Sequence, residues 1–397
     1  MKRWKLAILG MALCGLALGL WSGTSAQAQN SIQILSEDVT VNYPRSVTFD
    51  LSASSSAAPI TSVRLLWQVG PDAAFTVQNL NVRPRQQVEV AYPLNAQFLS
   101  IPPFGQISYR WQIRDEQGNE LITENRTIEY EDTRNDWQEL SNEHLRMLWY
   151  GYDEAFASSL FTIVDDAYVR LAAAFGVELT RKPTVVVYSD RQAFAEFQGM
   201  MNNVEFVIGR YFPGHNITVN LVTEDMPRRV YAETLAHELS HLYSDNFYVG
   251  FSRIPLWLEE GLATYNESVN PQAKLVMVQL AAARGALVPF IDLPAAIRDS
   301  DLTVTNLAYA EGATVFQFIT EHWGEARLAD FLSAFRRTTS LDSVATQVFG
   351  ENSVDFELDW RSWLGFPVDE VPQLWPTPTL RPYDFPTPAY VAPGQTG

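Results

Sequence analysis

Cysteine is almost absent from this sequence, whose 397 residues contain only Cys14. We expect the segment that carries Cys14 to be removed, so the mature chain would have no disulfide bond, thiolate metal ligand or cysteine nucleophile. Basic residues are also few, at 28 against 46 acidic residues, which gives a formal net charge of −18. Phosphate backbones and anionic lipid headgroups repel so acidic a chain. The composition therefore argues against nucleic-acid binding.

Long apolar runs are lacking too. The N-terminal run from Leu6 to Leu20 spans about 15 residues, short of the roughly 20 that cross a bilayer. It follows the basic stretch Lys2–Lys5 and precedes Ala26-Gln27-Ala28, a small-x-small cleavage pattern. We predict a bacterial-type signal peptide over residues 1–28 and export to the extracellular space or cell envelope, with a retained membrane anchor as the alternative. The mature charge would be 25 − 46 = −21.

Residues 29–132 alternate between apolar and polar positions, as in half-buried strands. Turn signals such as Gly70-Pro71-Asp72 separate the alternating runs. Six or seven short strands in about 100 residues predict an immunoglobulin-like β-sandwich. We find no catalytic polar cluster there, and expect a packing module or one that binds another protein or a glycan. The faces predicted to be buried are Val47, Phe49 and Leu51; Val63, Leu65, Trp67 and Val69; and Ile107, Tyr109, Trp111 and Ile113.

Residues 135–366 change to a mixed pattern. Glu154 to Phe175 reads as an amphipathic helix that Gly176 ends. Strands and a short helix follow, and helical patterns then dominate from Arg228 to Leu364, so we predict an α+β domain with a helical C-terminal half. Eight prolines mark residues 367–397 as a disordered tail. The strands and short helix are predicted at Pro183–Tyr188, Arg191–Gln198, Val204–Arg210 and Ile217–Leu221.

The segment His237-Glu238-Leu239-Ser240-His241 carries the clearest chemistry. On a helix, positions i and i+4 share a face, so both imidazoles can bind one metal ion, and zinc is the expected ion. Glu238 is offset by one position, which puts its carboxylate beside the metal. There it can act as general base for a zinc-activated water that attacks a carbonyl.

A catalytic zinc site needs three protein ligands and one open position. The third ligand could be Glu259 or Glu260, and 18 residues separate His241 from Glu260. Both glutamates border the apolar stripe of the helix predicted around them, so helical phase does not decide between them.

The segment Trp257-Leu258-Glu259-Glu260-Gly261-Leu262-Ala263 resembles the W-L-x-E-G-x-A form of gluzincin metallopeptidases, in peptidase MA-like domains and relatives of aminopeptidase N. The resemblance covers roughly residues 135–365. It implies that Glu260 is the third zinc ligand and Glu259 the variable position. Tyr309-Ala310-Glu311-Gly312-Ala313 is similar to the Y-x-K-G-A stretch of aminopeptidase N relatives, with Glu311 in place of lysine. That similarity implies that Tyr309 donates to the oxyanion, with His322 as an alternative donor.

We therefore expect a secreted zinc metallopeptidase that acts on peptides or proteins. The upstream segment 214–221 lacks the amine-anchoring G-x-M-E-N stretch of aminopeptidase N relatives, which favours cleavage of internal bonds. We expect the substrate backbone to pair with a free edge of the strand Ile217–Leu221. The alternatives are a secreted binding or scaffold protein that keeps zinc without turnover, and a zinc hydrolase for other bonds. His144 and His215 are expected to serve structure or surface.

Overall fold

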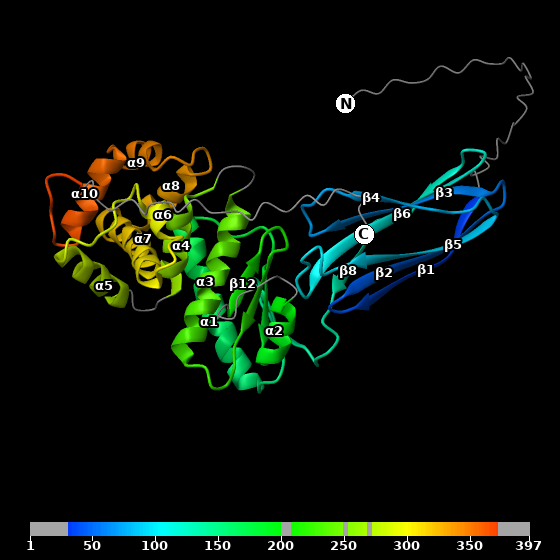
Figure 1. The fold of residues 1–397 in the computed structure, drawn as a ribbon, viewed down its shortest axis with the longest axis horizontal. Helices are drawn as coiled ribbons and strands as arrows, with labels where there is room; N and C mark the ends of the chain where they lie inside the picture. Colours follow the sequence, from blue (N-terminus) through cyan, green and yellow to red (C-terminus); the bar gives the residue numbers. More distant parts are fainter. Residues whose placement is uncertain (1–30, 200–207, 249–252, 268–271, 372–397) are drawn as a thin grey trace, which may run out of the picture.

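The computed structural model describes residues 31–199, 208–248, 253–267 and 272–371. The predicted signal peptide and the tail beyond residue 371 lie outside these ranges. The chain forms an N-terminal pair of β-sheets at one end, a mixed sheet in the middle and a helical half at the other end (Figure 1). No helix in the described ranges combines the length and apolar character needed to cross a membrane.

Within residues 31–132, eight strands form two sheets, one more strand than the upper end of our prediction. One sheet has the order β1-β2-β5, and the other β4-β3-β6-β7, with β8 also pairing with β6. The faces predicted to be buried meet in one common core between the sheets. The strands are β1 (Ile32–Asn42), β2 (Ser46–Ser55), β3 (Ile60–Val69), β4 (Thr76–Leu80), β5 (Gln87–Asn95), β6 (Gly105–Asp115), β7 (Glu120–Ile122) and β8 (Arg126–Tyr130).

The second part of the chain is built on a sheet of order β12-β13-β11-β10-β9. Its three central strands are parallel and both edge strands are antiparallel to their neighbours. Helix α1 (Glu154–Phe175) crosses between β10 and β11, and both of its ends fall where the sequence predicted, since Asp153 caps its first turn and Gly176 ends it in a left-handed conformation. The other elements are β9 (Gln138–Ser141), β10 (Arg146–Trp149), β11 (Thr184–Tyr188), α2 (Arg191–Gly199), β12 (Gly209–Phe212) and β13 (Ile217–Leu221).

One prediction about this sheet was wrong. The strand Ile217–Leu221 has no free edge, because β13 pairs with β11 on one side and β12 on the other. A tight turn at Pro213-Gly214 reverses the chain, so that β12 pairs with β13. Strand β12 therefore covers the edge of β13 that we had expected to be open. Among the described residues, the edge strand on this side is β12 itself.

From Arg228 onward the described chain is helical, as the pattern predicted. Helix α3 (Arg228–Phe247) packs against α1, β12 and β13, and α4 (Leu256–Glu267) packs between α3 and α7. One hydrophobic core joins these helices to the mixed sheet. The remaining helices are α5 (Gln272–Ala283), α6 (Leu293–Ala296), α7 (Leu302–Trp323), α8 (Glu325–Ala334), α9 (Leu341–Phe349) and α10 (Ser353–Trp363).

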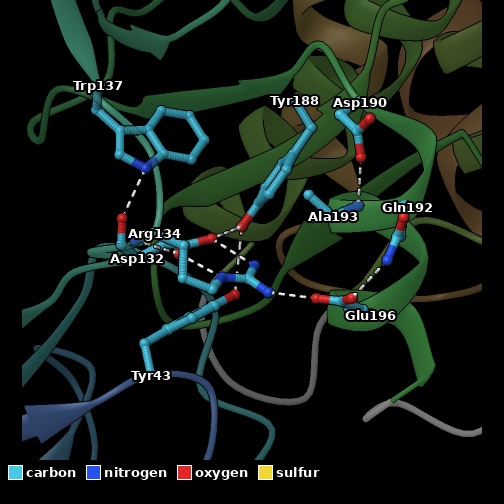
Figure 2. A network of polar contacts seen from close by, with 9 residues as sticks. All are labelled: Tyr43, Asp132, Arg134, Trp137, Tyr188, Asp190, Gln192, Ala193 and Glu196. Carbon is cyan, nitrogen blue, oxygen red and sulfur yellow. Dashed lines mark hydrogen bonds and ion pairs between the residues drawn. The ribbon is translucent and has the colours of Figure 1, made fainter.

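A buried polar network ties the two-sheet region to the mixed sheet (Figure 2). Asp132 is fully buried and accepts hydrogen bonds from the Arg134 guanidinium at 2.7 Å and from the Tyr188 hydroxyl at 2.8 Å. The Tyr188 hydroxyl also meets that of Tyr43 at 3.2 Å, and Arg134 bonds Glu196 of α2 at 2.6 Å. A charge this deeply buried needs its partners. The network therefore fixes how the two regions pack.

We predict that Asp132→Ala lowers the free energy of unfolding by about 3 kcal/mol, the lower end of the range for breaking a buried ion pair. The lower end applies because Arg134 is partly exposed and keeps Glu196. Chemical denaturation of the variant and of Asp136→Asn, a neighbouring exposed carboxylate, provides the measurement and its control. Equal stability of Asp132→Ala and wild type would contradict the prediction.

Candidate metal centre

Helix α3 presents His237 and His241 one turn apart on the same face, and α4 brings Glu260 against them. The Nε2 atoms of the two histidines lie 3.0 Å apart. A carboxylate oxygen of Glu260 lies 3.4 Å from Nε2 of His237 and 3.3 Å from Nε2 of His241. Donors around a tetrahedral zinc ion are about 3.3 Å apart, given bond lengths near 2.05 Å. The three donors thus fit Zn²⁺.

Glu259, the competing candidate ligand, takes a different place. Its carboxylate lies 3.6 Å from Nδ1 of His241, which is the other nitrogen of the ring. Adjacent positions on α4 point about 100° apart around the helix, so the two glutamates meet His241 from different sides. In the described ranges, the cluster able to hold a metal is His237, His241 and Glu260, all of whose donors lie within 4.8 Å of one another.

The cluster is strongly anionic. Burial lowers the pKa of His237, but Glu260 and Glu267 outweigh it and raise the pKa to about 9. Burial likewise opposes the positive charge on His241, whose pKa Glu259 and Glu260 raise to about 10. Burial raises the pKa of Glu260, but its hydrogen bonds with both histidines lower it to about 2. The carboxylates therefore favour a cation at this point.

Glu238 lies beside the three donors and lines a cavity of about 330 Å³ next to His237. Burial raises the pKa of its carboxyl group, and the charges of His237 and His241, together with a hydrogen bond from the Tyr211 backbone N–H, lower it in part. A side chain on Gly209 of β12 would clash with Glu238, since a Cβ there would lie 2.7 Å from its Cγ. The missing side chain lets the edge strand approach the glutamate. The cavity is lined by Ile208, Gly209, Val230, Glu233, Thr234, His237, Glu238 and Glu267.

Tyr309 comes from α7 and faces the same cluster. Its ring centroid lies 6.3 Å from that of His237. Burial raises the pKa of its hydroxyl, and so does Glu260, with which the hydroxyl forms a hydrogen bond. The hydroxyl is therefore protonated at neutral pH and can donate. His322, the alternative donor, is 13 residues further along α7, about 20 Å away at 1.5 Å per residue, and packs against Trp323.

The remaining expected residues lie outside the cluster. Glu311, which replaces the lysine of the similar stretch, is fully buried and accepts a hydrogen bond from the Val288 N–H at 3.0 Å. His144 pairs with Asp165 at 2.7 Å. His215 is half-buried, and desolvation lowers its pKa to about 4. None of these three side chains is a member of the metal cluster.

Two glycines set the position of α4 relative to α7. A Cβ on Gly261 would lie 2.5 Å from the carbonyl carbon of Gly312, and a Cβ on Gly312 would lie 2.7 Å from the Trp257 carbonyl oxygen. The helices thus touch through their backbones. This contact places Glu260 and Tyr309, which precede the two glycines in sequence, on facing sides of the centre.

Sequence analysis missed two residues of the centre. Glu267 accepts or shares the proton of His237 Nδ1 at 2.7 Å and so orients the ring. It follows Glu260 by seven positions, two helical turns, so the spacing carried a usable signal. The Tyr211 ring stacks on His241 with centroids 5.0 Å apart. Nothing in the sequence indicated that contact, because it depends on how β12 packs on α3.

Fold and site together define a metallohydrolase-type centre on an α+β scaffold. Residues 163–365 match the family model of the Peptidase MA superfamily. The match covers just over half of the chain, so the chain belongs to this superfamily. At the level of the family it is a zinc metallopeptidase, for which peptides or proteins are the substrates.

Solved structures give distant likenesses. An M1 zinc metallopeptidase from Deinococcus radiodurans is 14% identical with a TM-score of 0.35, over 87% of this chain and 97% of that one. An aminopeptidase N family protein from Idiomarina loihiensis is 10% identical with a TM-score of 0.34, over 79% of this chain and 71% of that one. No curated protein matches the chain. Membership of the superfamily rests on the family model.

We predict that the purified protein binds about one zinc ion per chain, and that Glu260→Ala abolishes this binding, because it removes one of three donors. Glu259→Ala should keep the one-to-one stoichiometry, because it leaves all three donors in place. Metal content after dialysis measures both variants. Retention of zinc in Glu260→Ala with its loss in Glu259→Ala would reverse the assignment of the third ligand.

Proposed function

We propose that the protein is an exported zinc endopeptidase of the gluzincin type, in which His237, His241 and Glu260 of an HExxH-x18-E arrangement hold the metal. The observation that carries the proposal is the meeting of the three donors at 3.0–3.4 Å beside a cavity that Glu238 lines. The N-terminal pattern of residues 1–28 supports export. The packing of two antiparallel sheets around one core supports an immunoglobulin-like sandwich for residues 29–132.

Bound zinc supplies Lewis-acid polarisation of the scissile carbonyl and of the attacking water. Glu238 acts as the base: its carboxylate accepts a proton from that water and then delivers it to the leaving amine. Burial raises the Glu238 pKa, which makes the carboxylate a better proton acceptor. The N–H of Tyr211 holds the carboxylate at the edge of β12.

Tyr309 stabilises the negative charge that develops on the carbonyl oxygen of the substrate. As the carbonyl carbon becomes tetrahedral, its oxygen gains negative charge, and the Tyr309 hydroxyl donates a hydrogen bond to it. The raised pKa of this hydroxyl keeps the proton in place for that donation.

We propose that the substrate backbone binds along the edge of β12 that has no partner strand among the described residues. The Leu221 N–H donates to the Ile208 carbonyl. Hydrogen-bonded and non-hydrogen-bonded residues alternate along an antiparallel pair, so the N–H and C=O of Gly209 and the C=O of Tyr211 face away from β13. The Tyr211 N–H faces the same way but already bonds Glu238. An extended peptide can pair there on both sides of the cut bond, whatever its sequence. The adjoining cavity can take a side chain.

A second candidate is removal of N-terminal residues. The cavity beside His237 contains the carboxylates of Glu233 and Glu267, and no Lys or Arg is among the described residues that line it. Carboxylates in such a place suit a free amine. Arg229 and Lys274 partly neutralise these two glutamates, which favours the endopeptidase.

We predict that Glu238→Gln keeps its zinc while turnover of a peptide falls by orders of magnitude, because the base is lost and the ligands remain. Tyr309→Phe should also keep zinc and lower kcat by roughly ten- to a thousandfold, the scale of one lost oxyanion donor. Metal content and steady-state kinetics measure both. Wild-type activity in Tyr309→Phe contradicts its role, and zinc-loaded wild type without any turnover favours the binding or scaffold alternative.

We further predict that a peptide with a blocked N-terminus is cleaved at internal bonds at a rate similar to its free-amine twin. Edge-strand pairing does not use the terminal ammonium group, so blocking it should cost little. Mass spectrometry of the products measures cleavage sites and rates. Stepwise loss of single residues from the free-amine peptide alone would establish the second candidate instead.

A further inference from the structure

The two histidines of the centre differ in what their second nitrogen contacts. Nδ1 of His237 has Glu267 at 2.7 Å. Nδ1 of His241 is buried and makes no hydrogen bond to any residue in the described ranges. A buried polar nitrogen left without a partner is unfavourable. His241 therefore differs from His237 in having no described hydrogen-bond acceptor for its Nδ1 atom.

Glu259 is the group that faces this nitrogen. Its side chain is only 11% exposed, and its carboxylate oxygen Oε1 lies 3.6 Å from His241 Nδ1. Within the described part of the chain, His241 is the one cationic group with which the Glu259 carboxylate forms an ion pair at 4 Å or less. Among the described residues, a buried carboxylate and a buried ring nitrogen without a hydrogen-bond partner therefore face each other.

Metal binding explains why this pair matters. When Nε2 of an imidazole gives its lone pair to a metal, the neutral ring carries its proton on Nδ1, and an acceptor for that proton fixes the ring orientation. The distance of 3.6 Å exceeds a hydrogen bond by about half an ångström. Tyr211 stacks on the face of the His241 ring, with 24° between the ring planes, and so limits rotation of the ring about its Cβ–Cγ bond. A small change in the side-chain torsions of Glu259 is enough to close the gap.

We propose that Glu259 is a positioning residue that accepts the Nδ1 proton of His241, as Glu267 does for His237, so that each zinc histidine has its own carboxylate. The inference rests on the same zinc centre as the proposed function but does not depend on peptide cleavage. Glu259 occupies the variable position of the W-L-x-E-G-x-A form, so this pairing is a property of this chain. We expect this hydrogen bond to lower the rate at which the centre releases its metal.

A purely structural role for Glu259 is the competing explanation. Glu259 lies in the first turn of α4, where a negative charge interacts favourably with the helix dipole. Two substitutions separate the explanations. Glu259→Gln removes the charge but keeps a carbonyl oxygen that can accept the Nδ1 proton, whereas Glu259→Ala removes both.

The first test measures the rate of zinc release from the full chain to a chelator in excess. We expect Glu259→Ala to release zinc about 10–100-fold faster than wild type, the scale for losing such a partner, and Glu259→Gln to stay within about threefold. Glu267→Ala should behave like Glu259→Ala. Glu311→Gln, which alters a buried glutamate that bonds the Val288 N–H and is not a member of the metal cluster, is the control and should not change the rate.

The second test observes the ring itself by nitrogen NMR of zinc-loaded protein with labelled histidine. In wild type, both His237 and His241 should show a protonated Nδ1 whose proton exchanges slowly with water. Glu259→Ala should speed exchange at His241 and leave His237 unchanged, and Glu267→Ala should do the reverse. Thermal unfolding checks that each variant is folded.

The results decide the proposal without a substrate. Equal zinc release from Glu259→Ala and wild type, or an unchanged His241 proton in that variant, overturns it. A Glu259→Gln variant as fast as Glu259→Ala assigns the effect to the charge and also overturns it. If the protein cuts no peptide but the zinc-release and NMR results hold, the proposed function fails and the positioning role stands.

Discussion

The backbone contact between α4 and α7 is the constraint on which the metal centre depends. Gly261 and Gly312 have no Cβ, and any side chain at either position would force the two helices apart. Helix α4 carries Glu259, Glu260 and Glu267, and α7 carries Tyr309. A shift of α4 by even one ångström would move three carboxylates relative to both histidines. Two absent side chains therefore set the distances between the charged ones.

The centre gathers negative charge to an unusual degree. Glu238, Glu259, Glu260 and Glu267 all approach the two imidazoles, and burial opposes each of these charges. Such a cluster needs compensating cations, and a bound metal, protonated histidine and Lys274 at the outer edge can supply them. The fold has thus concentrated in one place the carboxylates that a divalent ion needs.

Local signals in the sequence were enough for some elements and not for others. Helix α1 was predicted to the residue because its cap and its terminal glycine are both local. The spacing of His237 and His241 on one turn is local too, and the seven-residue spacing of Glu260 and Glu267 could have been used. The free edge predicted for Ile217–Leu221 was wrong, since which strand lies outermost in the described sheet depends on the turn that pairs β12 with β13. Helical phase could not separate Glu259 from Glu260, because their difference arises from how α4 crosses α3, and the choice of Glu260 rested on the resemblance to gluzincins.

The buried network around Asp132 has a further consequence for the molecule as a whole. Its members come from both sides of the boundary drawn from the sequence near residue 132: Tyr43 precedes it, and Tyr188 and Glu196 follow it. Cutting the chain there would leave a tyrosine and a glutamate of the second region facing water without their partners. The two-sheet region is therefore attached to the second region by these buried contacts as well as by the connecting chain. A molecule bound at the far end of this region would therefore keep a fixed orientation relative to the metal centre.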